Sequence, residues 1–151
     1  PIQFHVNNNN YFSYLFMKLN DLSITFHTGK NKECVDFYVR YFDVKITFDC
    51  EWYVTIQFQS EVNPFIFLSF MKPEYGSAGA AFTGGLTLNL NVADVDAEYA
   101  RLKLPGITFC DEIADHEWGD RSFSIKDPIG NVLCVYSPRE MGPEYQNAVK
   151  E

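Results

Sequence analysis

Four cysteines are the first residues whose chemistry can be judged from their spacing: Cys34, Cys50, Cys110 and Cys134. No two of them form a CxxC pair, and none has a histidine at the spacing of a zinc site. We interpret them as free thiols, which predicts a reducing, cytoplasmic location.

Three histidines are spread too widely along the chain to suggest a shared site. His5 lies in the N-terminal segment. His27 ends the run ITFH and is either a residue of the helix entry or a metal ligand. His116 is either a solvated side chain or a residue that contacts a ligand or transfers a proton.

Five carboxylates lie within ten residues around Trp118, namely Asp111, Glu112, Asp115, Glu117 and Asp120. They belong to a chain of net charge −8, which repels phosphate backbones and anionic lipid heads and so argues against nucleic-acid and membrane partners. The segment is either a solvated loop or an acidic rim that attracts cationic ligands. We also find no apolar run of about 18 residues, the length that a membrane helix needs.

Aromatic residues make up 17% of the chain. They either fill a strand-rich core or line a ligand pocket, because flat rings suit both settings. Trp52, Phe67 and Trp118 are the candidates for stacking on a ligand.

The elements that must position these residues are indicated by an internal repeat. Segments 34–48 and 94–109 share a pattern in which each matched pair is 61 residues apart. The pairs are Tyr38 and Tyr99, Arg40 and Arg101, Tyr41 and Leu102, Ile46 and Ile107, Thr47 and Thr108, and Phe48 and Phe109.

Each copy has the same predicted setting. A short strand precedes apolar residues at helical spacing, and three further strand-like runs follow. The sequence therefore predicts two β-α-β-β-β modules in one domain over residues 19–138. Module one covers 19–73, a linker rich in glycine and alanine covers 74–85, and module two covers 86–138.

Two terminal segments lie outside this domain. Residues 1–18, with four consecutive asparagines, are expected to be an extension: a native arm, a cloning remnant or an over-long start. Residues 139–151 are expected to be a C-terminal tail.

The run NVADVDAEYARL (91–102) and the string WG-x-R-x-F-x-x-x-DP-x-GN (118–131) resemble the glyoxalase/bleomycin resistance/extradiol dioxygenase superfamily, also called vicinal oxygen chelate proteins. The resemblance covers about residues 19–138. It implies an α+β fold in which two tandem β-α-β-β-β modules form a curved half-barrel sheet around a cleft.

Enzymes of that superfamily hold a divalent metal with side chains from inward-facing strand positions, two per module. Counted back from the helices and taken in the last strands, these positions fall on Ser23, Thr87, Ser69 and Cys134. Hydroxyls and one thiol make a poor transition-metal site. The resemblance is therefore nearest, in its motifs, to the metal-free bleomycin resistance members, and no cofactor is predicted.

The resemblance leaves three functions open. The first is metal-free binding of a small, cationic aromatic, antibiotic-like molecule, and the second is binding of some other small molecule. The third is a metal-dependent lyase or transferase of the glyoxalase I or fosfomycin-resistance type, so enzyme activity stays undecided and catalytic residues are not assigned.

A homodimer is expected, because modules of this fold commonly complete their clefts across an interface. Arg121 either pins the acidic loop through Asp120 or Glu117, or contacts an anionic group of the ligand. The predicted ligand-binding residues are Ser23, Trp52, Phe67, Ser69, Thr87, His116, Trp118, Arg121 and Cys134.

Overall fold

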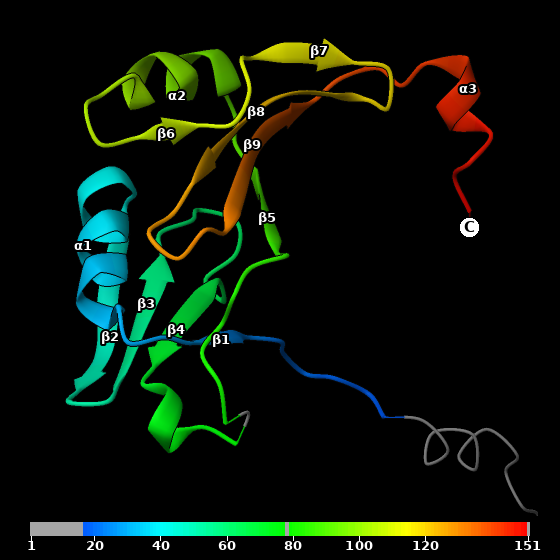
Figure 1. Ribbon diagram of the computed structural model, residues 1–151. Coiled ribbons are helices and arrows are strands. Elements are labelled where there is room, and N and C mark those ends of the chain that lie inside the picture. The colour runs from blue at the N-terminus through cyan, green and yellow to red at the C-terminus, as the bar shows by residue number, and fades with distance from the viewer. Residues whose placement is uncertain (1–16, 78, 151) are drawn as a thin grey trace, which may run out of the picture.

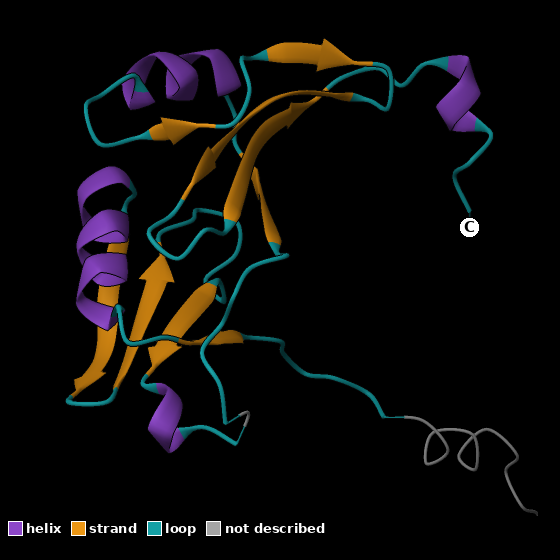
Figure 2. Ribbon diagram, in the orientation of Figure 1, coloured by secondary structure: helices purple, strands orange, loops and turns teal. Residues whose placement is uncertain are grey.

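The computed structural model describes residues 17–77 and 79–150, and shows two small sheets accompanied by two longer helices (Figures 1 and 2). The first part of the predicted extension, residues 1–16, lies outside the described residues. The α+β class with two curved, unclosed sheets is confirmed.

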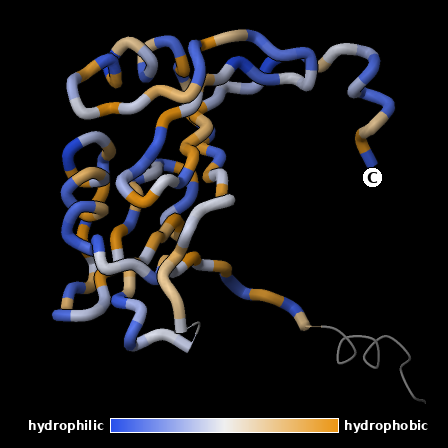
Figure 3. Tube along the Cα trace, in the orientation of Figure 1, coloured by the Kyte–Doolittle hydropathy of each residue, from blue (hydrophilic) through white to orange (hydrophobic). Residues whose placement is uncertain are grey.

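The first module contains β1 (Ile24–His27), α1 (Asn31–Tyr41), β2 (Val44–Cys50), β3 (Tyr53–Phe58) and β4 (Phe67–Met71). Its sheet has the order β1-β4-β3-β2, with β1 parallel to β4 and the other pairs antiparallel. Hydrophobic and polar residues alternate along β3, as Figure 3 shows for these strands, so the sheet has one apolar face for α1 to cover. A short 3-10 helix, η2 (Pro73–Tyr75), follows β4.

The second module repeats this order with one addition. It contains β5 (Thr87–Asn91), α2 (Val95–Leu102), β6 (Thr108–Phe109), β7 (Ala114–His116), β8 (Asp120–Lys126) and β9 (Val132–Pro138), and α3 (Pro143–Gln146) follows in the tail. The sheet order is β5-β9-β8-β6, and β7 pairs with β8 beyond the end of β6.

The strand β7 corrects the expectation of a solvated loop over residues 111–120. Ala114, Asp115 and His116 pair with Ser122, Arg121 and Asp120 of β8. A run of three residues with two titratable side chains carries no strand periodicity, so only the pairing partner reveals the strand.

The two helices begin and end for local reasons. Asp94 caps α2 by accepting a hydrogen bond from the Ala97 N–H at 3.0 Å. Tyr38 on α1 and Tyr99 on α2 are both buried and occupy matching places in the repeat. Each helix covers the apolar face of its own sheet, and the opposite face, called here the helix-free face, carries no helix.

The turn DPIGN between β8 and β9 forms as its sequence indicates. Asp127 Oδ1 accepts hydrogen bonds from the N–H groups of Ile129 (3.1 Å) and Asn131 (2.8 Å), and Gly130 has φ +83°, which disfavours side chains with a Cβ. The turn reaches back to the first module, because Tyr38 Oη donates to Asp127 Oδ2 at 2.9 Å.

One hydrophobic cluster spans both modules. It joins Phe37, Tyr38 and Tyr41 of α1 to Leu102 of α2 and Ile125 of β8. Around it, Arg101 donates to the Tyr41 carbonyl at 2.8 Å, and the Tyr41 hydroxyl donates to the Pro105 carbonyl at 3.2 Å. No helix within the described residues is both long and apolar enough to cross a membrane.

Candidate functional site

The helix-free face of the first sheet carries hydroxyl groups at its centre. Thr25, Thr55 and Ser69 lie side by side on β1, β3 and β4. Thr55 and Ser69 share a hydrogen bond of 2.9 Å, and Thr25 and the Tyr53 hydroxyl lie 3.3 Å apart. Burial alone would raise the pKa of the Tyr53 phenol, but hydrogen bonds from Ser69, Thr25 and Thr55 outweigh it and leave that pKa below its ordinary value.

Next to these hydroxyls lies an exposed set of aromatic rings, called here the aromatic group: Phe48, Trp52, Tyr53 and Tyr75. Trp52 stacks on Tyr75 with ring centroids 5.0 Å apart, and Tyr53 meets both Phe48 and Trp52 edge-on. Phe48 is 53% exposed, Trp52 38% and Tyr75 54%. Large apolar side chains gathered at a surface in this way mark a place of binding.

The helix-free face of the second sheet is polar. Asn89 on β5, Cys134 on β9 and Ser124 on β8 lie side by side, in the places that Thr25, Ser69 and Thr55 hold in the first sheet. Burial raises the pKa of the Cys134 thiol, the hydroxyls of Ser122 and Ser124 offset part of this rise, and the charge of Asp120 adds to it. The thiol form of Cys134 is thereby favoured.

At one end of this face lies a compact group of four side chains, the His116 cluster: His116, Trp118, Asp120 and Ser122. Asp120 Oδ1 lies 2.9 Å from His116 Nδ1, and its other oxygen accepts from the Trp118 indole N–H at 2.9 Å. Ser122 Oγ lies 3.2 Å from the same imidazole nitrogen. The two rings stack with centroids 4.2 Å apart and planes 10° apart, so Asp120 fixes both rings at once.

A hollow of about 450 Å³ adjoins this cluster. It is lined by Asp115, His116, Glu117, Arg139 and Glu140. Three carboxylates against one guanidinium make the hollow acidic, and they lie in and beyond the segment that the sequence singled out as an acidic rim.

The predicted ligand-binding residues fall into two groups on different sheets. Trp52, Phe67 and Ser69 belong to the first sheet or its turns, and His116, Trp118 and Cys134 to the second. Phe67 pairs with Gln57 and so faces the helix-free side, half-buried. These assignments remain predictions, and the structure adds Thr25, Phe48, Tyr53 and Asn89, which the sequence did not single out.

Two of the predicted positions are displaced by two residues along their strands. Thr25 rather than Ser23 lies beside Ser69, and Asn89 rather than Thr87 lies beside Cys134. Counting back from a helix identifies the face of a strand but not the depth, which is set by pairing with β4 and β9.

Arg121 has different partners from those expected. Its guanidinium donates to both oxygens of Asp96 on α2, at 2.9 to 3.2 Å, and to Asp115 on β7 at 3.1 Å. The expected partners Asp120 and Glu117 are therefore wrong. Arg121 lies level with Ser137 on the side of the sheet that α2 covers, and it ties β7 to that helix.

The metal positions implied by the resemblance hold neutral groups. The four side chains at the register positions are Thr25, Ser69, Asn89 and Cys134, and a divalent transition metal prefers imidazole, carboxylate or thiolate ligands. His27 lies at the end of β1, where its ring packs against Gly76. No group of three or more potential ligands converges within residues 17–77 and 79–150.

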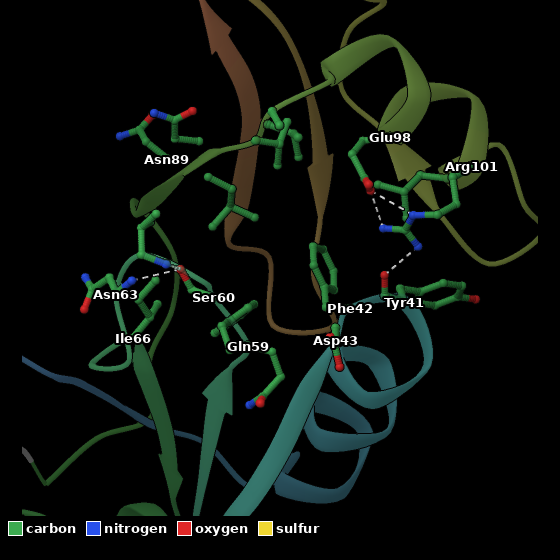
Figure 4. A pocket seen from close by; sticks show the side chains of 18 of the residues that line it. Tyr41, Phe42, Asp43, Gln59, Ser60, Asn63, Ile66, Asn89, Glu98 and Arg101 are labelled. Atoms are coloured by element: carbon green, nitrogen blue, oxygen red, sulfur yellow. Dashed lines mark hydrogen bonds and ion pairs between the residues drawn. The ribbon is translucent and has the colours of Figure 1, made fainter.

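A larger cavity, of about 940 Å³, lies elsewhere, between the two modules (Figure 4). It is lined by residues of β5, α2 and the segment between β3 and β4, and none of the predicted site residues faces it.

Residues 23–135 match the profile of the Glyoxalase/Bleomycin resistance protein/Dioxygenase superfamily. The chain belongs to this superfamily. The match covers both modules, so it carries the paired β-α-β-β-β architecture as well as the motifs.

Solved structures of this superfamily share the fold. A glyoxalase/bleomycin resistance protein/dioxygenase from Nocardioides is 17% identical, with a TM-score of 0.72 over 89% of this chain and 95% of that one. A superfamily member from Sphaerobacter thermophilus is 23% identical, with a TM-score of 0.63 over 81% and 99%. TnmS3, an antibiotic binding protein from a Streptomyces species, is 24% identical, with a TM-score of 0.60 over 82% and 99%.

Curated relatives match over a shorter segment. An uncharacterized protein of Mycobacterium bovis and one of Mycobacterium tuberculosis are each 36% identical over 53 residues, which is 35% of this chain. The chain spans about a third of the length of these relatives, at 35% and 31%.

Proposed function

We propose that this superfamily member binds a small cationic aromatic molecule on its helix-free faces without a metal ion. The observation that carries the proposal is the aromatic group, in which Phe48, Trp52 and Tyr75 remain largely exposed. Flat ligand rings stacked on such side chains gain about 0.5 to 1.5 kcal/mol per contact beyond area burial, and a positive charge over a ring gains about 0.5 to 2 kcal/mol.

Electrostatics favour the same ligand class. The chain carries a net charge of −8, and the hollow beside the His116 cluster is lined by Asp115, Glu117 and Glu140. A cation is therefore attracted to the second module and an aromatic ring to the first. The fold is shared with an antibiotic binding protein from Streptomyces, which supports this class of ligand.

The donor set argues for binding without a metal. Thr25, Ser69 and Asn89 are neutral, and the pKa of Cys134 is raised, so none of the four side chains supplies the anionic or imidazole ligands that a metal-dependent lyase or transferase needs. The metal-dependent alternative has no structural observation in its favour.

We further propose that two copies of the chain complete the binding site. The aromatic group and the His116 cluster lie on different sheets, and the cavity between the modules of one chain is lined by other residues. A homodimer that sets the first sheet of one protomer against the second sheet of its partner joins the aromatic and the acidic halves.

Tryptophan fluorescence titrated with bleomycin and a panel of cationic aromatic drugs tests the proposal. Trp52→Leu should weaken binding by about tenfold, the equivalent of one stacking contact. Phe65→Leu is the matched control, because Phe65 is an exposed aromatic side chain (66%) outside the aromatic group. Binding should also weaken with added salt.

Absence of any response across the panel, or equal affinity in the Trp52→Leu variant and the native chain, would overturn the ligand class. The dimer is tested by light scattering. A mixture of Trp52→Leu and His116→Ala protomers should regain one intact site per dimer if the two halves come from different chains, and none if each chain binds alone.

A further inference from the structure

The cavity between the modules is lined by consecutive residues of one strand. Asn89, Leu90 and Asn91 of β5, followed by Val92 and Ala93, all face it. Side chains of a strand alternate between the two faces of a sheet, so a cavity that meets every residue in turn meets the strand edge-on.

This edge of β5 has no strand partner within the described residues. β5 is the outermost strand of its sheet and pairs only with β9. Val92 donates its N–H to the Tyr136 carbonyl, and Leu86 accepts from the Val132 N–H, so the even-numbered residues point their backbone groups at β9. The backbone N–H and C=O groups of Asn89 and Asn91 therefore point outward, along the cavity.

The side chains around this edge suit a ligand with apolar substituents. Phe42, Phe58 and Leu90 form the floor with the buried Leu102 and Val135. Val62 and Ile66, exposed to 93% and 37%, stand at the mouth on the segment between β3 and β4.

The segment that carries Val62 and Ile66 is held in place by its own hydrogen bonds. Ser60 Oγ accepts from the N–H groups of Val62 (3.2 Å) and Asn63 (3.1 Å), and Gln57 donates to the Pro64 carbonyl at 2.7 Å. The apolar mouth is thus a built feature of the fold, and not the result of a segment without contacts.

The charges around the cavity are largely paired with each other. Figure 4 shows Glu98 and Arg101 on one wall, where Arg101 donates to Glu98 and to the Tyr41 carbonyl. Asn63 and Asn89 lie on the opposite wall. The groups left to recognise a ligand are therefore mainly amides of the β5 edge together with apolar surface.

We infer that this cavity binds a short, extended peptide with apolar side chains, which adds to the free edge of β5. An extended peptide supplies the alternating N–H and C=O groups that a strand edge lacks, and its side chains fall on the apolar floor and mouth. The cavity volume, about 940 Å³, lies within the range of small-ligand sites. This site is separate from the helix-free faces and does not depend on the function proposed for them.

The test uses the full chain and a panel of N-acetylated, C-amidated tetrapeptides built from valine, leucine and phenylalanine. Calorimetry should show saturable binding of at least one peptide. The same peptide with N-methylated amides keeps its side chains but loses its donors, and its affinity should fall at least tenfold if edge pairing holds it.

Asn89→Pro removes one outward N–H and leaves the bonds from β5 to β9 intact, because proline is tolerated at the open edge of a strand. We expect about five- to tenfold weaker peptide binding than in Asn89→Ala, which keeps the N–H. Thr25→Pro is the matched control on β1, the edge strand of the first sheet, and should bind the peptide like the native chain. Circular dichroism checks that each variant is folded.

Two results would overturn the inference. The first is equal binding of the plain and N-methylated peptides, or no binding of any peptide in the panel. The second is a change from dimer to monomer in light scattering on Asn89→Pro alone, because the edge of β5 would then be occupied by a second copy of the chain.

Discussion

The hydroxyl of Tyr38 on α1 donates a buried hydrogen bond of 2.9 Å to Oδ2 of Asp127, 89 positions later in the β8–β9 turn. The same carboxylate oxygen accepts from the Asn131 side chain at 2.7 Å, and its neighbour accepts two backbone N–H groups. One aspartate therefore shapes a turn of the second module and fastens it to the helix of the first.

Replacing Tyr38 with phenylalanine should lower the free energy of unfolding by about 1.5 to 3 kcal/mol, because a buried bond to a charged acceptor is lost. Urea denaturation followed by circular dichroism measures the change. Tyr75→Phe is the control, since Tyr75 is exposed and its hydroxyl has no hydrogen bond within the described residues. Equal effects of the two substitutions would contradict the role of the Tyr38 bond.

Stability should also depend on pH through Cys34. Burial raises the pKa of this thiol from 9.0 to about 12. The unfolded chain then loses the proton at lower pH than the folded chain, so the contribution of Cys34 is complete below pH 9 and is lost between pH 9 and 12. We expect about 1 to 2 kcal/mol of this loss by pH 10.5.

Unfolding by urea at pH 8, 9.5 and 10.5 measures this loss. The Cys34→Ala variant should be less stable at every pH, because a buried side chain is shortened, but its stability should fall less steeply with pH than that of the native chain. Parallel pH profiles would show that another group causes the decline.

Arg121 should act on stability and not on ligand binding. Arg121→Gln removes the ion pairs with Asp96 and Asp115, so the melting temperature should fall, and the difference from the native chain should shrink at high salt. Arg40→Gln is the control, because Arg40 makes no ion pair with the described part of the chain and only lies over the Tyr41 ring. Weaker drug binding in Arg121→Gln at unchanged stability would instead make Arg121 a ligand contact.

Metal ions should not bind stoichiometrically. Calorimetry and elemental analysis with Ni, Zn, Mn and Fe should show no tight site, because the register positions hold Thr25, Ser69, Asn89 and Cys134. Tight uptake of one ion per chain that disappears in His27→Ala or His116→Ala would favour the metal-dependent alternative.

Several local features could be predicted from the sequence because neighbouring residues determine them. The alternation in YVTIQF indicates a strand with one apolar face, and β3 has that pattern of burial. In DPIGN, the carboxylate, the fixed φ of proline and the tolerance of glycine for positive φ are sufficient to make the turn.

Features that depend on pairing could not be predicted in the same way. The three residues of β7 form a strand only because β8 offers an edge, and Arg121 meets Asp96 only because α2 packs over that part of the sheet. The two-residue displacement from Ser23 to Thr25 has the same origin, since a count along one chain does not contain the register of β1 against β4.

The sequence by itself determined the superfamily, the duplicated module and the acidic character of the second half, because these rest on composition, periodicity and short motifs. Only the tertiary structure decided which side chains share a face: Thr25 with Ser69, Asn89 with Cys134, and Trp52 with Tyr75. It also decided that the open edge of β5 borders a cavity between the modules, because a cavity is made by surfaces that are distant in the chain and brought together only by packing.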